Sequence, residues 1–373
     1  MGPARASTFA QLAAIALAAG LALVAPPRAF LDGFYIHSFY AAVQPAITGL
    51  TNRLPFAAAD VLIIATAAAL VAFWFSTLRR SRGLGALLRA IVGTAALACV
   101  FYIWFLVAWG WNYLRPGFAS TLPRASAALD SDQLLRLEQR IVAALNAAAP
   151  PAHAEHERGA GQAAAMTRAR QQTLALIGID RTVPQTVPKH TLLDAYFDSV
   201  GVSGMFFPFT FETLLASDLL WFEYPFTLQH EWGHVAGIAR ESDANFVAAL
   251  ATLDSDDAVL RYSGLLMAYE ALPRTTADRG LSQLVLGDYA AIRRRDRQRI
   301  NPLTAKLAWH AYDTYLKSQH VRSGVVNYSE YARLLLETKL GRSALSRALS
   351  SEREPGRASA QPLRPVLATR RGA

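Results

Sequence analysis

The chain has 373 residues, of which 53% are hydrophobic and only 17% are charged. Soluble domains usually carry about a quarter charged residues, so this composition favours a membrane part followed by a globular part. The net charge is +9, but the arginines lie in short connections and a tail without interleaved aromatic residues, which argues against nucleic acid as a partner. The single cysteine, Cys99, excludes an intrachain disulfide and a cysteine-type metal site.

Three apolar runs occupy the first third of the chain, and we predict a membrane domain over residues 1–115. Its three transmembrane helices are expected at about 8–25, 56–78 and 90–111. The second and third runs are each long enough to cross a hydrocarbon core of roughly 30 Å. The first run is the shortest, and a cleaved signal peptide is the alternative interpretation of it.

The arginines predict the orientation of these helices. Four of them lie between the second and third runs, which indicates a cytoplasmic connection (Arg79, Arg80, Arg82 and Arg89). Arg5 keeps the amino terminus on the same side, so three crossings would put everything after Asn112 outside the cytoplasm. We therefore expect a multi-pass protein of the inner (plasma) membrane, in contact with the lipid bilayer, with an extracytoplasmic carboxy-terminal domain.

Residues 116–186 are predicted to form a helical linker region. A helical apolar period covers Asp130–Ala148, and a second helix is expected over Met166–Leu176. The polar segment that begins at Pro150-Pro151 is expected to break the chain between these two helices.

A globular domain is predicted over residues 187–345. Its first part, Val187–Phe226, is rich in aromatic and β-branched residues with Gly and Pro, which indicates short strands or a hairpin. Further helices are expected at Ala244–Leu253, Ala258–Leu272, Thr304–Gln319 and Ser329–Leu340. Residues 346–373 are polar and contain proline, so we predict a disordered basic tail.

The sequence His-Glu-Trp-Gly-His at residues 230–234 indicates a zinc site. On a helix, His230 and His234 lie one turn apart on one face, and two imidazoles from one helix make half of a tetrahedral Zn²⁺ site. Glu231 lies at the neighbouring edge of that face, where its carboxylate can take a proton from a water at the metal. We predict His230 and His234 as metal ligands and Glu231 as the catalytic base.

A helix that carries two structural histidines is the alternative, because so short a pattern also arises by chance. Three features argue against it. A strand-like segment precedes the motif, the motif itself has an apolar context, and Gly237 follows, which can end the helix and turn the chain back.

The third ligand is expected in the acidic cluster that follows the motif. A metzincin-type continuation would require a histidine at position 240, which is Arg240. Glu241 is the favoured ligand and Asp243 is the second choice. If a helix has begun by Glu241, Asn245 shares its face and is predicted to support a ligand histidine, as in the gluzincin class. Either carboxylate could instead merely complement a helix dipole.

Two further residues are candidates for the neighbourhood of the metal. Tyr262 could donate a hydrogen bond to the oxyanion of a tetrahedral intermediate, and a core tyrosine is the alternative. Glu212 could line the cleft or hydrogen-bond the motif helix.

Several segments together resemble the bacterial membrane-protein family named domain of unknown function 3810: WGWNYLRP, PKH, PFTFE, PFTLQHEWGH, ARESDANF and RYSG. The resemblance covers most of the chain, to about Leu340, and implies a zinc-metallopeptidase-like fold with an unknown substrate. The family usually shows Glu-x-Glu-Ala-Asn where this chain has Glu-Ser-Asp-Ala-Asn at 241–245. The shorter Asp243 is therefore a poorer candidate ligand.

We accordingly expect a mainly α protein, in which three transmembrane helices precede a mostly helical, zincin-like α+β domain with a small hairpin or sheet before the motif helix. The leading functional hypothesis is a membrane-anchored, zinc-dependent metallopeptidase that hydrolyses a peptide or protein substrate outside the cytoplasm. The alternative is a non-catalytic membrane receptor or assembly factor that retains a zinc-stabilised, peptidase-like fold.

Overall fold

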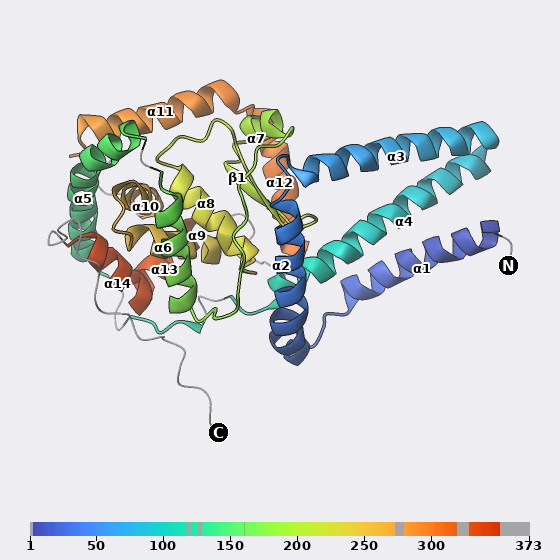
Figure 1. The fold of residues 1–373 in the computed structure, drawn as a ribbon, viewed down its shortest axis with the longest axis horizontal. Coiled ribbons are helices and arrows are strands. Elements are labelled where there is room, and N and C mark those ends of the chain that lie inside the picture. The colour runs from blue at the N-terminus through green and yellow to red at the C-terminus, as the bar shows by residue number, and fades with distance from the viewer. Residues whose placement is uncertain are drawn as a thin grey trace. The chain divides into compact units, whose positions relative to one another are not determined.

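The computed structural model describes residues 3–117, 121–125, 129–159, 161–272, 280–318 and 328–350. It divides into two compact units, Met1–Arg115 with Phe207–Glu212, and Pro116–Phe206 with Thr213–Ala373. Most described residues are helical (Figure 1), and the only strands among them are β1 (Gly204–Phe207) and β2 (Glu212–Leu215), which form one small sheet. The prediction of a mainly α protein with a small sheet before the motif helix is confirmed.

The first unit is a group of long helices with exposed apolar surfaces. Its elements are α1 (Pro3–Leu23), the π-helix η1 (Phe30–Phe39), α2 (Tyr40–Thr51), α3 (Ala58–Arg80), α4 (Leu84–Ala108) and the 3-10 helix η2 (Gly110–Leu114). Helix α4 packs against both α1 and α3 (Figure 1). Large apolar side chains such as Val71 and Phe75 on α3 and Val100 on α4 are more than half exposed, as expected for helices that face lipid.

Two helices, not the three expected, are long and apolar enough to cross a membrane among the described residues. These are α3 and α4. In α1 the apolar part is Thr8–Leu23, and a helix of that length rises about 24 Å. This is shorter than a hydrocarbon core of roughly 30 Å, which is the physical reason for the correction.

Glu212 holds the amino terminus of α3. Its carboxylate accepts hydrogen bonds from the backbone N–H groups of Ala58 (3.0 Å) and Ala59 (2.8 Å) and from the Thr210 hydroxyl (2.7 Å). The first N–H groups of a helix lack partners within the helix, and Ala57 at the N-cap provides no side-chain acceptor. The structure therefore gives Glu212 a capping position.

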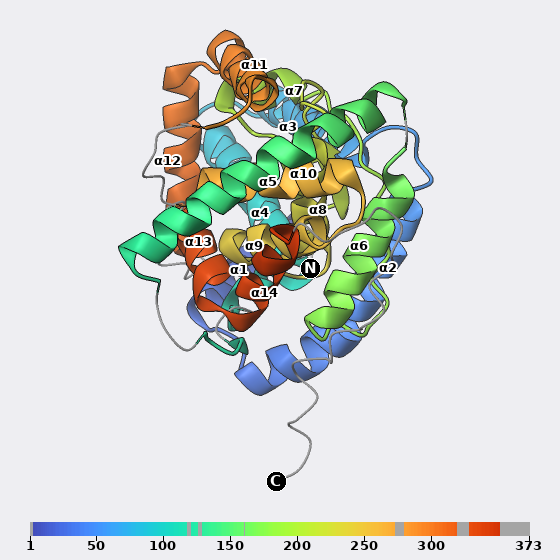
Figure 2. The same cartoon turned by 90° about the vertical axis from the view of Figure 1, so that its left-hand side faces the viewer.

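The second unit is built around three consecutive helices, α8 (Tyr224–Val235), α9 (Glu241–Leu253) and α10 (Ala258–Ala271), which pack against one another. Around them lie α5 (Ser131–Glu157), α6 (Ala163–Leu176), α13 (Tyr328–Glu337) and α14 (Lys339–Ala348) (Figure 2). Helices α7 (Asp194–Val200), α11 (Gln283–Arg299) and α12 (Pro302–Ser318) complete the unit. Every residue of α9 is buried except Glu241 and Asn245, so this helix forms the centre of the core.

Helix α5 runs through Pro150-Pro151, so the predicted break at these prolines is wrong. Tertiary contacts hold the part of α5 beyond them. His153 Nε2 lies 2.9 Å from Asp288 Oδ2 on α11, and His156 stacks on Trp221 with ring centroids 4.4 Å apart. Such packing outweighs local propensity, even where a proline removes a backbone donor.

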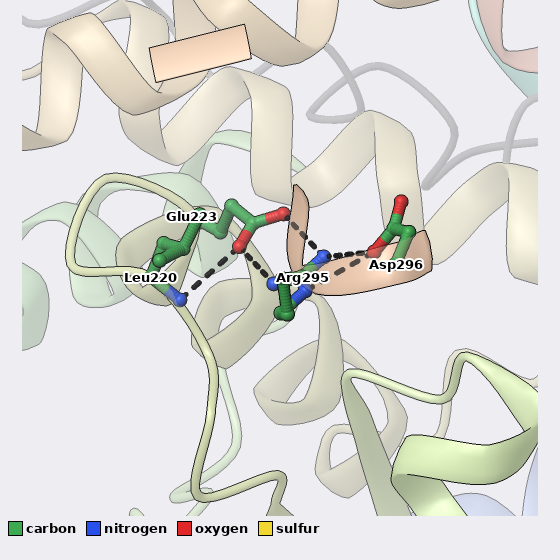
Figure 3. Close-up of polar contacts among 4 residues, drawn as sticks. All are labelled: Leu220, Glu223, Arg295 and Asp296. Carbon is green, nitrogen blue, oxygen red and sulfur yellow. Dashed lines mark hydrogen bonds and ion pairs between the residues drawn. The ribbon is translucent and has the colours of Figure 1, made fainter. Parts of the chain in front are cut away.

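An ion pair connects α11 to the start of the motif helix (Figure 3). Arg295 donates to both carboxylate oxygens of Glu223, with Nη2 3.2 Å from Oε1, and it also donates to Asp296. Glu223 Oε2 accepts a further hydrogen bond from the backbone N–H of Leu220 (3.1 Å). Because Glu223 directly precedes α8, its charge also complements the positive end of the helix dipole. The beginning of α8 is therefore fixed from two directions.

The carboxy-terminal segment is described only in part. Helix α14 ends at Ala348, a few residues into the range predicted as a tail. Residues 351–373 of the predicted disordered tail lie outside the described residues.

Candidate metal centre

The motif helix α8 is held by side chains on the face that does not carry the histidines. Gln229 donates to the carbonyl oxygen of Met166 (2.8 Å), and the Trp232 indole donates to the carbonyl oxygen of Thr186 (3.1 Å). Both side chains are buried and lie three positions apart on the helix, so they fix the rotation of α8 about its axis. The direction in which His230 projects follows from this rotation.

His230, His234 and Glu241 converge on one point. The two Nε2 atoms lie 3.0 Å apart, and Glu241 Oε2 lies 3.2 Å from His230 Nε2 and 3.6 Å from His234 Nε2. Tetrahedral bonds of about 2.0–2.1 Å to zinc would separate ligand atoms by about 3.3 Å. The observed distances bracket this value. Within the described part of the chain, these three residues form the group that could hold a metal ion.

Hydrogen bonds fix the orientation of both imidazoles. His230 Nδ1 lies 2.8 Å from Asn245 Oδ1, and His234 Nδ1 lies 2.7 Å from the carbonyl oxygen of Ile238. Since both partners are acceptors, each Nδ1 carries a proton, which leaves Nε2 as the ring atom that can bind a metal. Two Nε2 atoms and a carboxylate oxygen therefore face one another, an arrangement that a bound cation would stabilise.

The charges of the site attract positive charge to this point. Burial acts to lower the pKa of His234, but the Glu241 carboxylate, helped by Glu231, outweighs it and raises this pKa to about 9. Burial acts to raise the pKa of Glu241, but the neighbouring imidazoles of His234 and His230 hold it well below its usual range. Both shifts arise from the attraction between Glu241 and positive charge at this point.

The turn after α8 brings Glu241 to the histidines. Gly237 has a φ of +84°, in the left-handed region that favours glycine. Its N–H donates to the carbonyl oxygen of His234 (2.8 Å), and the N–H of Ile238 donates to that of Gly233 (3.2 Å). This pattern ends α8, directs the Ile238 carbonyl at the His234 ring and allows α9 to begin at Glu241.

Glu231 is 4% exposed and lies against β1. Gly204 permits this approach, because a Cβ atom there would lie 3.0 Å from Glu231 Oε1. Burial raises the pKa of Glu231. Its Oε2 atom is buried and has no hydrogen-bond partner in the described part of the protein. Such an atom is costly unless a water or a ligand supplies a donor.

Tyr262, Asp243 and Glu212, the other predicted site residues, are not part of the three-residue cluster. The Tyr262 hydroxyl donates to Asp288 Oδ2, which His153 also contacts, and burial raises the pKa of Tyr262. Asp243 is buried but does not belong to the three-residue cluster. Glu212 caps α3, as described above. The structure thus groups Glu231 and Asn245 with the three candidate ligands, while the roles expected of Tyr262 and Glu212 beside a metal stay predictions.

Sequence reasoning missed one residue that contacts the cluster. The hydroxyl of Tyr312 on α12 donates to Glu241 Oε1 at 2.6 Å. Tyr312 lies 71 residues after Glu241 in the sequence. Helical periodicity predicted a helix around Tyr312, but no motif distinguishes this tyrosine from the others. The Ile238 carbonyl was missed as well, because a backbone acceptor has no signature in the sequence beyond the neighbouring Gly237.

One family model matches the chain. It carries the description "Protein of unknown function (DUF3810)" and covers residues 35–336, a range that contains the whole candidate metal centre. No curated protein and no solved structure matches the chain at a significant level.

Proposed function

The chain belongs to this family of proteins of unknown function, and on that premise we propose that it is a zinc metallopeptidase anchored in a membrane. One observation carries the proposal. His230 Nε2, His234 Nε2 and Glu241 Oε2 converge at distances suited to zinc, and the unpartnered Oε2 of the buried Glu231 lies in the same charged environment. Two imidazoles, one carboxylate ligand and one further carboxylate beside them are the groups of a gluzincin-type site.

The number of ligands supports a catalytic rather than a structural zinc site. Structural sites are closed by four protein ligands, whereas catalytic sites use three and leave the fourth position to water or substrate. The described residues offer three donors at this point. Asp243, the only other carboxylate of the acidic cluster after the motif, does not belong to the group.

In the proposed reaction, His230, His234 and Glu241 would hold a zinc ion, which would act as a Lewis acid by lowering the pKa of a water and polarising the substrate carbonyl. Glu231 accepts a proton from the attacking water at Oε2 and returns it to the amine that leaves. Because burial raises the pKa of Glu231, this carboxylate is a better proton acceptor than an exposed one. Asn245 and Ile238 keep the two imidazole rings in the orientation that presents Nε2 to the metal.

A peptide substrate suits the neighbourhood of Glu231. Strand β1 forms one side of the sheet, and Gly204 at its start contacts the Glu231 carboxylate. An extended peptide that pairs with such a strand would bring its backbone carbonyl close to the proposed base. This favours hydrolysis of a peptide bond over reactions of compact substrates.

We also propose that the site faces outward from the plasma membrane. Arg79, Arg80, Arg82 and Arg89 flank the connection between α3 and α4, and positive charge of this kind stays in the cytoplasm. With α3 and α4 as the two crossings, the chain after α4 would lie outside the cytoplasm, whatever the location of α1.

The test is metal-dependent hydrolysis by the full-length protein in detergent. We expect cleavage of fluorescein-labelled casein that 1,10-phenanthroline abolishes and added Zn²⁺ restores, because the chelator removes the Lewis acid. The isomer 1,7-phenanthroline, which does not chelate, serves as the control and should leave the rate unchanged. A protein that binds zinc but cleaves neither casein nor a mixed peptide library would contradict the proposal and favour a non-catalytic receptor or assembly factor.

A further inference from the structure

The two carboxylate oxygens of Glu241 have different partners. Oε2 faces the imidazoles, at 3.2 Å from His230 Nε2 and 3.6 Å from His234 Nε2. Oε1 accepts the hydrogen bond from the Tyr312 hydroxyl at 2.6 Å. A carboxylate can bind a metal through one oxygen or through both, and here the second oxygen is engaged by a hydroxyl donor.

We propose that Tyr312 is a positioning residue of the metal centre. Its hydroxyl keeps Glu241 bound to the metal through Oε2 alone and thereby preserves an open coordination position. If Oε1 also bound, it would occupy the position that a catalytic zinc site leaves to water. This inference rests on the metal-binding part of the proposed function and is independent of the peptidase part.

Glu241 needs an external donor to hold this orientation. It is the first residue of α9 and one of the two residues of that helix that are not buried. Its side chain is 23% exposed, so core packing does not fix its rotamer. A hydrogen bond to a charged carboxylate is roughly twice as strong as one between neutral groups, which suits Tyr312 to this task.

A few specific contacts, and not a shared hydrophobic core, hold α12 where Tyr312 can reach Glu241. None of the residues 302–314 is buried. The Trp309 indole donates to the carbonyl oxygen of Val200 (2.9 Å), and Asn301 N–H donates to the carbonyl oxygen of Ser199 (2.9 Å). Trp309 also packs edge-on against the Tyr312 ring, with centroids 6.1 Å apart. The contact with Glu241 is therefore not a by-product of core packing.

The other tyrosine predicted near the metal cannot replace this donor. The Tyr262 hydroxyl is engaged with Asp288. Tyr312 is thus the tyrosine that the structure assigns to the candidate ligand set.

The test compares Zn²⁺ and Co²⁺ binding by the wild-type full-length protein and by Tyr312→Phe. Phenylalanine keeps the ring contact with Trp309 and removes only the hydroxyl. We expect the dissociation constant for Zn²⁺, measured by competition with a chromophoric chelator, to rise by about 10-fold or more, the range typical for partners of metal ligands. We expect the visible absorption spectrum of bound Co²⁺ to change, because a second carboxylate oxygen in place of water would alter the set of ligand atoms around the ion.

The matched control is Tyr196→Phe, which alters a half-exposed tyrosine on α7, the helix against which α12 packs. It should leave both readouts at their wild-type values, and thermal melting checks that both variants remain folded. A Tyr312→Phe protein with wild-type Zn²⁺ affinity and an unchanged cobalt spectrum would overturn the inference. So would weaker binding with an unchanged cobalt spectrum, because single-oxygen binding would then not depend on the hydroxyl.

Different results would contradict the proposed peptidase activity and the proposed role of Tyr312. A wild-type protein that binds metal but cleaves no peptide would end the peptidase proposal and leave the Tyr312 comparison valid. A folded wild-type protein that binds neither Zn²⁺ nor Co²⁺ would overturn the metal centre and, with it, the role of Tyr312.

Discussion

Glu231→Gln is expected to lower the rate of peptide hydrolysis by about 10²–10⁴-fold, the usual contribution of a general base. Glutamine has nearly the same shape but cannot accept a proton from water near neutral pH. Glu231 is not one of the three residues whose donor atoms converge, so zinc affinity should stay close to that of the wild type. Steady-state kinetics on a confirmed substrate, together with zinc titration, measure both effects.

The same substitution should not destabilise the protein. Burial disfavours the charged form of Glu231, as its raised pKa shows, and Oε2 has no partner. A neutral amide removes part of this desolvation cost, so the melting temperature should be equal or higher. Glu157→Gln, at the exposed end of α5, is the control and should leave rate, zinc affinity and melting temperature unchanged. A Glu231→Gln protein with the wild-type rate would show that another group acts as the base.

His234→Ala is expected to weaken zinc binding by roughly 10²-fold or more. Zinc binding to four-ligand sites contributes about 10–16 kcal/mol, which is about 3 kcal/mol for each ligand. Loss of the His234 imidazole should also change how much zinc raises the melting temperature. Zinc should raise the melting temperature of the wild-type protein, because it binds the folded state, and should raise that of the variant much less.

His310→Ala provides the comparison for this variant. His310 lies on α12 and is exposed, so its removal should change neither the zinc dissociation constant nor the zinc-dependent rise in melting temperature. Isothermal titration in detergent measures the affinity, and scanning calorimetry measures the stability. Unchanged zinc affinity in His234→Ala would remove this imidazole from the ligand set.

Local spacing was enough to anticipate that His230, His234 and a carboxylate from the acidic cluster after the motif meet at the candidate metal centre. His230 and His234 share a face because a helix repeats about every 3.6 residues. The positions of Glu241 and Asn245 depended on where the next helix begins, and the structure begins α9 at Glu241. Gly237 was the local signal for this arrangement, since a glycine with positive φ allows the chain to turn there.

Contacts between distant segments were beyond the reach of the sequence. Tyr312 meets Glu241 only because α12 is held near Val200 by Trp309, and no spacing in the sequence encodes that contact. The path of α5 through Pro150-Pro151 likewise depends on partners more than 60 residues away, such as Trp221. Glu212 was expected near the motif helix, and its capping of α3 depends on a segment of chain more than 150 residues earlier.

The most direct measurement of the central claim is the zinc content of the folded full-length protein, purified without chelators and equilibrated with Zn²⁺. One mixed nitrogen and oxygen site predicts about one tightly bound zinc ion per chain by mass spectrometry of the metal. A folded chain that retains no zinc after removal of the free ion would contradict the account.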